Sequence, residues 1–291
     1  HRDATSDNNI YVQPAIAADG SVLAAVHHYE SSGTGLDEYV LRRFSPQGEL
    51  LAEAPLPEHD GLFLNMVWMQ GALCAQYRVS QTGADDVLEF VCFDETLQPV
   101  ATLRGCSAPT ARWAGGWLTF DRVGSGPLSA TLLSDTGEAL WTKELAQLTG
   151  TAGWRDAYAE NGDLLLLIAS YDDQARQPTN ATVLRCTPQG EATAQTALAL
   201  PKLEGNYTLC DLRADESGYQ VLAVARTETR VRLLRFAEDG QCLGSKDANV
   251  EDDVYYTACF ATLGGEAYIC AASRNEHDLV RLFPMNELKG E

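Results

Sequence analysis

The sequence predicts an all-β fold of six repeated antiparallel units, and three observations support this prediction. The first is a repeated phrase in which an apolar run enters a Gly-containing turn and an extended run leaves it. It is clearest at Val40–Glu53, and related versions occur at 183–191, 233–240, 131–138, 90–96 and 280–284. The second is a turn glycine that recurs every 45 to 56 residues, at Gly20, Gly71, Gly116, Gly162, Gly218 and Gly265. The third is that no stretch combines helical periodicity with helix start and stop signals. Six periods of this length, each with four short strands, are typical of a six-bladed β-propeller.

Each unit is expected to supply its four strands in the same order. An apolar strand follows each turn glycine, and a polar loop of variable length leads to the strand that enters the repeated turn. A fourth extended stretch then completes the unit. Because one four-stranded meander cannot bury both of its faces, neighbouring units are expected to pack face to face. The predicted blades are 13–57, 64–104, 108–148, 155–201, 209–246 and 257–287, in a single domain spanning residues 1–291.

The two chain ends are expected to differ from the other units. Pro284 lacks a backbone N–H, so the segment that follows it is a poor fourth strand. The segment 1–12, through either His1–Ser6 or Asn8–Val12, is therefore expected to close the ring. The alternative is that part of the closing strand lies upstream of His1. The chain starts at His1 rather than at Met, and we expect that an N-terminal segment, such as a signal peptide or a lipoprotein anchor, has been removed.

The composition excludes some classes of partner. The chain has 21 Lys and Arg against 41 Asp and Glu, which gives a formal net charge of −20. Nucleic acids and anionic membrane surfaces are bound by clustered basic residues, so neither is expected as a partner. No apolar run approaches the ~20 residues that a membrane-spanning helix needs. We expect a monomer that is extracytoplasmic or secreted, with membrane anchoring through the removed N-terminal segment as one option.

The eight cysteines do not have the spacing of a zinc or redox motif, because no C-x-x-C sequence occurs. Most lie in apolar runs, and Cys186 occupies the place that Phe44 and Phe236 hold in sister repeats. We expect mainly buried thiols, with one or two disulfides in an oxidising compartment. The adjacent pair His27 and His28 lacks a third ligand nearby in the sequence, so neither a metal site nor a cofactor is predicted.

Two short stretches resemble known propeller families. Residues Asp135–Trp141 end in Thr-Gly-Glu-Ala-Leu-Trp, which resembles the tryptophan-docking repeat of pyrroloquinoline-quinone-type propellers and of their non-enzymatic outer-membrane-assembly relatives. Residues Asp19–Ala24 are similar to the start of a strand in TolB-type six-bladed propellers. These resemblances imply a bacterial-style propeller, and they transfer no catalytic residue.

The candidate binding residues are Arg and Tyr side chains at the ends of the second strands. Four arginines follow their turn glycine by six to nine residues, and a tyrosine holds this place in the other two units. Arg binds carboxylates in a forked geometry, and aromatic rings stack on sugars or peptide groups. The predicted mouth residues are Tyr29, Arg78, Arg122, Trp154, Arg155, Tyr171, Arg226, Tyr255 and Arg274. The predicted channel-lining residues are Arg112, Asp156, Asp211 and Arg213. The alternative is that each arginine pairs with a loop acid such as Asp85, Asp121 or Glu276.

No hydrolase elbow G-x-S-x-G, zinc motif H-E-x-x-H or phosphate-binding loop occurs in the sequence. The sequence therefore predicts a non-enzymatic binding or scaffold propeller that engages a protein, peptide or glycan through one mouth of the ring. The alternative is a propeller glycoside hydrolase or lyase that uses channel-mouth carboxylates such as Asp156 and Asp211. An intracellular WD-type scaffold is disfavoured, because Trp-Asp strand endings and Gly-His turns are missing.

Overall fold

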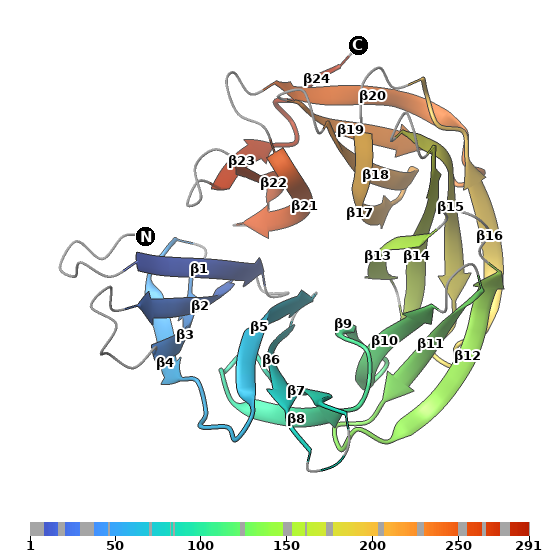
Figure 1. Cartoon of the computed structure of the whole chain (residues 1–291). Helices are drawn as coiled ribbons and strands as arrows, with labels where there is room; N and C mark the ends of the chain where they lie inside the picture. Colours follow the sequence, from blue (N-terminus) through green and yellow to red (C-terminus); the bar gives the residue numbers. More distant parts are fainter. Residues whose placement is uncertain are drawn as a thin grey trace. The chain divides into compact units, whose positions relative to one another are not determined.

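The computed structural model describes residues 9–16, 21–29, 38–45, 47–69, 72–81, 83, 85–122, 126–147, 153–160, 162–172, 177–202, 207–225, 230–249, 255–263, 266–273 and 280–290. Within these residues there is no helix, and the strands form six antiparallel sheets (Figure 1). The described residues therefore contain no helix that could cross a membrane.

The first three sheets follow one another along the chain. Sheet one contains β1 (Asn9–Ile16), β2 (Val22–Tyr29), β3 (Glu38–Phe44) and β4 (Leu50–Pro55). Sheet two contains β5 (Leu62–Met69), β6 (Ala72–Val79), β7 (Val87–Phe93) and β8 (Pro99–Arg104). Sheet three contains β9 (Pro109–Trp113), β10 (Gly116–Arg122), β11 (Pro127–Leu133) and β12 (Ala139–Gln147). In each sheet every strand pairs with the next strand in sequence.

The last three sheets follow the same meander order. Sheet four contains β13 (Gly153–Glu160), β14 (Asp163–Tyr171), β15 (Pro178–Cys186) and β16 (Ala192–Leu198). Sheet five contains β17 (Tyr207–Asp215), β18 (Gly218–Ala225), β19 (Arg230–Phe236) and β20 (Cys242–Asn249). Sheet six contains β21 (Tyr255–Leu263), β22 (Glu266–Ser273) and β23 (Val280–Pro284).

The chain ends differ from the regular pattern. The short strand β24 (Lys289–Gly290) does not join sheet six but pairs antiparallel with β20 of sheet five. Residues 9–12 form the first half of β1 and pair with β2, instead of making the separate Asn8–Val12 closing strand. The other candidate for that strand, His1–Ser6, lies outside the described residues.

The chain divides into two compact units. Unit one comprises His1–Phe120 and Thr131–Trp141, and unit two comprises Asp121–Ala130 and Thr142–Glu291. In unit one, the buried side chains of sheets one and two form a core around Leu41, Leu73 and Phe93. In unit two, sheets four and five share a core, and every residue of β18 is buried. The loss of alternation in β18 is expected for a strand whose two faces are both covered.

The repeated turn has one backbone geometry in five sheets. At Ser45–Glu49, the Gly48 N–H donates to the Ser45 carbonyl (2.9 Å) and the Ser45 N–H donates to the Glu49 carbonyl (2.7 Å). The same two bonds recur in the turns that start at Asp94, Ser134, Thr187 and Ala237. The fourth turn residue has a positive φ in each case, at Gly48, Leu97, Gly137, Gly190 and Gly240. Glycine adopts this conformation without steric cost, which explains why the phrase recurs in the sequence.

One disulfide lies among the described cysteines. Cys74 on β6 and Cys92 on β7 are direct cross-strand partners and are bonded to each other. The other six cysteines carry thiols, and Cys186 is buried as expected. Burial raises the pKa of the Cys186 thiol to about 11, so this thiol is protonated at neutral pH.

Candidate functional site

The predicted mouth residues lie at or beside strand ends wherever the structure describes their backbone. Tyr29, Arg122 and Tyr171 are the last residues of β2, β10 and β14, and Arg78 precedes the last residue of β6. The backbones of Trp154 and Arg155 lie near the start of β13, and Tyr255 begins β21. Arg226 and Arg274 lie outside the described residues. Of the nine predicted side chains, the structure describes two, those of Arg78 and Tyr171.

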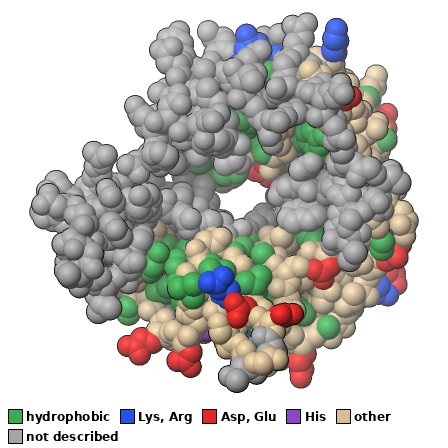
Figure 2. All heavy atoms as spheres, viewed as in Figure 1, with side chains coloured by type: hydrophobic (Ala, Val, Ile, Leu, Met, Phe, Trp, Pro, Cys, Tyr) green, Lys and Arg blue, Asp and Glu red, His purple; other side chains and the backbone are tan. Residues whose placement is uncertain are grey.

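Arg78 lies in the middle of an exposed row across sheet two. Its cross-strand partners are Leu62 on β5 and Leu88 on β7. The exposed fractions are 58% for Leu62, 49% for the Arg78 side chain and 37% for Leu88. Leu64, the unpaired residue of a bulge in β5, is 41% exposed. We call Leu62, Leu64, Arg78 and Leu88 the sheet-two patch. Figure 2 shows hydrophobic atoms with basic and acidic groups beside them where Figure 1 draws β5 to β7.

The charge of Arg78 is only weakly satisfied within the protein. Its Nε lies 3.6 Å from the Asp86 carboxylate, and both side chains are close to half exposed. Exposed ion pairs contribute about 0–1 kcal/mol, because water screens the charges and two mobile side chains must be ordered. A ligand carboxylate can therefore replace Asp86 at little cost. The sequence left open the alternative that each arginine pairs with a loop acid such as Asp85. Arg78 does pair with a loop acid in the structure, but that acid is Asp86.

The opposite face of the same strand end is a fixed polar network. The Gly61 N–H donates to His59 Nδ1 (2.9 Å), so His59 Nε2 carries the proton and donates to Glu89 (2.7 Å). The second Glu89 oxygen lies 3.4 Å from Arg104 Nε. The His59 ring stacks on Tyr77 with centroids 3.9 Å apart, and burial raises the pKa of Tyr77 to about 12.

This network holds the loop 56–61, which leads directly into Leu62. It therefore positions one end of the sheet-two patch on a rigid support. Sequence reasoning missed His59 and Glu89 because 30 residues separate them in the chain. The one available signal was the location of His59 in a loop between two blades.

Tyr171 supports the junction of two sheets in unit two. Its hydroxyl accepts a hydrogen bond from the Leu209 N–H of β17 (2.9 Å), and its half-buried ring packs against the shared core of sheets four and five. The Leu209 N–H lies where β17 bulges, so a partner from another sheet satisfies it. Tyr171 thus has a packing role here.

Three of the four predicted channel residues have described side chains, and all three are engaged. Arg112 forms an ion pair with Asp135, and its guanidinium lies 4.6 Å from the centre of the Trp117 ring. The Trp117 indole N–H also donates to Asp135 (2.8 Å). The hydrogen bond from Arg112 is the main cause that holds the pKa of the Asp135 carboxyl below its usual range.

Asp211 and Arg213 lie on β17 and contact β21 of the next sheet in unit two. The Asp211 carboxylate accepts the backbone N–H groups of Leu212 (2.8 Å) and Phe260. Arg213 donates to Gln220 (3.0 Å), and its guanidinium lies over the Phe260 ring (4.9 Å). Both side chains thus contribute to the junction of sheets five and six. The side chain of the fourth residue, Asp156, lies outside the described part.

Within the described residues, no group of three His, Cys, Asp or Glu side chains is arranged to hold a metal ion. His27 and His28 are part of β2, but their side chains lie outside the description. The absence of a metal site at this pair therefore stays a prediction from the sequence.

No protein-family model matches the chain, and no curated protein sequence matches it. Solved structures do resemble it. An α-L-arabinofuranosidase, Arb93A from Fusarium graminearum, is 10% identical, covers 99% of this chain and 95% of its own, and has a TM-score of 0.54. A subtype N10 neuraminidase-like protein of A/little yellow-shouldered bat/Guatemala is 12% identical over 95% of this chain and 94% of its own, with a TM-score of 0.50.

A third similar structure, a prolyl endopeptidase, is 15% identical and covers all of this chain but 42% of its own, with a TM-score of 0.51. At these identities the likeness concerns the fold alone. Together with the six antiparallel sheets, it confirms the predicted fold class: the chain has the all-β fold of a six-bladed propeller.

Proposed function

We propose that the protein is a non-enzymatic binding propeller that engages a protein or peptide segment through the sheet-two patch. The segment carries a carboxylate for Arg78 and an aliphatic side chain for Leu62 and Leu88. The observation that carries the proposal is the row of three exposed cross-strand residues in which two leucines flank a weakly paired arginine. Clustered exposed apolar side chains rimmed by charge are typical of interaction sites.

The patch favours a peptide over a neutral glycan. Sugars are usually bound by flat aromatic rings, whereas the described part of this patch is aliphatic. The Arg78 fork suits a carboxylate, from an Asp or Glu side chain or from a chain terminus.

The Cys74–Cys92 disulfide supports a location outside the cytoplasm, because disulfides persist mainly in oxidising compartments. An extracytoplasmic or secreted location, and kinship with TolB-like or pyrroloquinoline-quinone-repeat propellers, are parts of this proposal. The protein is proposed to act as a monomer.

A peptide array tests the proposed patch. The probes are peptides with a free or side-chain carboxylate beside Leu, their amide counterparts, and an array of neutral and acidic oligosaccharides. We expect the carboxylate peptides to bind, and Arg78→Gln or Leu62→Ser to weaken binding at least tenfold.

Leu140→Ser is the matched control, because Leu140 is 55% exposed on β12 and lies outside the patch. It should leave peptide binding unchanged. Undiminished affinity of the Leu62→Ser/Arg78→Gln double variant, or binding of oligosaccharides alone, would overturn the proposal.

The alternative function is a glycoside hydrolase or lyase, and the near full-length likeness to an α-L-arabinofuranosidase favours it. Asp211 fits this role poorly, because two backbone N–H groups already bind its carboxylate. Hydrolysis of aryl glycosides, including an α-L-arabinofuranoside, that is lost in Asp156→Asn would establish the alternative and displace the binding proposal.

A further inference from the structure

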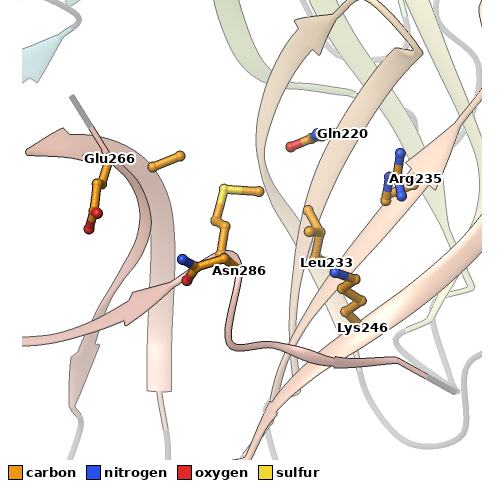
Figure 3. Close-up of a pocket in the computed structure, with 8 residues that line it drawn as sticks. Gln220, Leu233, Arg235, Lys246, Glu266 and Asn286 are labelled. Atoms are coloured by element: carbon orange, nitrogen blue, oxygen red, sulfur yellow. The ribbon is translucent and has the colours of Figure 1, made fainter.

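A cavity of about 400 Å³ lies within unit two, between sheets five and six. Its walls come from β18, β19, β20, β22 and the segment after β23. Figure 3 shows the side chains of Arg235 and Lys246 on one side and that of Glu266 on the opposite side. Cavities of roughly 300–1,000 Å³ are the size that small-molecule sites use. This cavity is separate from the sheet-two patch, which belongs to unit one.

The two cations of the cavity have no carboxylate partner in the described part of the chain. Arg235 donates only to the Ser217 hydroxyl (3.4 Å), and Lys246 forms no ion pair there. This is unexpected in a chain with 41 acidic and 21 basic residues. On the same two strands, Arg232 and Asp247 form a forked ion pair at 2.6 and 2.7 Å. The strands β19 and β20 thus neutralise one cation and leave two others facing the cavity.

The sequence repeat allows Arg235 to be compared with the arginines at the same position in other sheets, two residues before the repeated turn. Arg185 holds the same place before the turn in sheet four and pairs with Asp163 at the start of β14 (3.3 Å). In sheet five, the strand register puts Gly218 at the position of that acid, and Arg235 donates instead to the hydroxyl of the preceding Ser217. In sheet one, Arg43 donates to Ser21 (3.0 Å). Hydrogen bonds from Thr96 and Gln98 outweigh burial and lower the pKa of the Asp94 carboxyl, and the charge of Arg43 adds a smaller contribution. Arg235 has no such direct acid: the nearest described carboxylate partner, Asp215, is reached only through the Ser217 hydroxyl, which donates to Asp215 (2.5 Å).

The remaining walls are rigid, and part of them is apolar. Leu233 is 2% exposed, and Met285 packs partly buried against the same core. The Gln220 amide is fixed by Arg213 and Asp215. Beyond β23, the Met285 N–H donates to the Ala267 carbonyl (3.0 Å), and β24 pairs with Lys246 and Asp247 of β20. This segment ties sheet six to sheet five along the wall, so the cavity is formed before any ligand arrives.

We propose that this cavity binds a small organic monocarboxylate. The carboxylate lies between the Arg235 guanidinium and the Lys246 ammonium, and the apolar part of the ligand lies on Leu233 and Met285. The Asn286 amide is available to a polar substituent. Two cations and Glu266 leave a net charge of +1 at the cavity, which favours a singly charged anion over phosphate or a dicarboxylate.

Titration calorimetry tests the site with named probes: phenylacetate, glucuronate and lactate as monocarboxylates, phenylacetamide as a neutral isostere, and inorganic phosphate. We expect at least one monocarboxylate to bind, with phenylacetamide and phosphate at least tenfold weaker. Arg235→Gln/Lys246→Gln should weaken monocarboxylate binding at least tenfold. Glu266→Gln should strengthen it about two- to fivefold, because it removes a like charge.

Lys143→Gln is the matched control, since it removes one exposed cation on β12, outside the cavity, and should change nothing. Leu62→Ser should also leave this binding intact, which separates the cavity from the sheet-two patch. Glu266→Gln keeps the test decisive if the double variant fails to fold, because a gain of affinity requires a folded site. Failure of all three monocarboxylates, or equal affinity for phenylacetamide, would overturn the proposal.

Discussion

The turns around Gly48 in sheet one and Gly240 in sheet five have the same backbone but different surroundings. Both glycines have a positive φ, of 88° and 86°, and both close the same pair of hydrogen bonds. A Cβ at Gly48 would meet nothing within 4 Å, whereas a Cβ at Gly240 would lie 2.0 Å from the Ala197 carbonyl oxygen of β16. The Gly240 carbonyl also accepts the Ala199 N–H (2.9 Å). One turn needs glycine for its backbone alone, and the other also needs it to dock on the neighbouring sheet.

The largest effect is expected for Gly240→Ala. The new methyl group would overlap the Ala197 carbonyl, and the residue would also have to adopt a left-handed backbone. We expect the free energy of unfolding to fall by about 3 to 5 kcal/mol. Urea denaturation of the whole chain, followed by circular dichroism, measures the change. A loss as small as that of the Gly48 variant would show that the two turns do not differ.

Leu97→Gly should have the next largest effect on the free energy of unfolding. It separates the cost of the left-handed backbone from the gain of side-chain packing at this turn. Leu97 holds the glycine position of the turn in sheet two with φ 66°, yet its side chain is buried in the unit-one core. Relief of the backbone strain should return about 1 kcal/mol, and loss of the buried side chain should cost about 3 kcal/mol. The expected net loss is about 2 kcal/mol in urea denaturation. A net gain would mean that strain outweighs packing at this turn.

Gly48→Ala should cost only about 1 kcal/mol, because the left-handed conformation is its single penalty. The same urea titration, run beside Gly240→Ala, gives the difference between the two turns directly. Gly48→Asn is the control, since Asn tolerates this conformation better than Ala and should lose less.

The smallest effect, and one of opposite sign, is expected for Ala114→Gly. Ala114 and Gly115 form the two-residue turn between β9 and β10, with φ of 48° and 77°. Ala114 is exposed, so the substitution removes strain without loss of packing. The free energy of unfolding should rise by about 0.5 to 1 kcal/mol. A lower melting temperature of this variant in a thermal scan would show that the backbone φ alone does not determine the stability of turns whose positive-φ residue is exposed.

The fold could be predicted because its determinants are local. The Ser45-Pro-Gln-Gly48 phrase specifies a tight hairpin through its own hydrogen bonds, and the copies report the period directly. The copy of the turn in sheet two was harder to recognise, because Leu97 stands where the other copies have glycine. Burial of the Leu97 side chain offsets the energetic cost of its left-handed backbone conformation. The pairing of β24 with β20 was not predictable, since two residues carry too little pattern to select a distant partner strand.

The candidate sites were predictable only in part. The spacing from the turn glycine located Arg78 at a strand end, because each strand residue advances the chain by a constant ~3.3 Å. Apolar residues in a strand pattern are predicted to be buried, so the exposure of Leu62 and Leu88 could not be predicted from the sequence. The charge of the cavity depends on Arg235 and Lys246 having no direct ion pair with a nearby acid, which is a property of the folded chain.

The pairing of β24 with β20 has a consequence for how the molecule would come apart from its carboxyl end. A carboxypeptidase, or a pulling force applied there, would strip the outer border of sheet five before it reached any strand of sheet six. The anchoring side chain Leu288, which belongs to the core shared by those sheets, would be uncovered in the same step. A force transmitted through a fusion partner attached after residue 291 would therefore act first on β20, which carries the cavity residue Lys246.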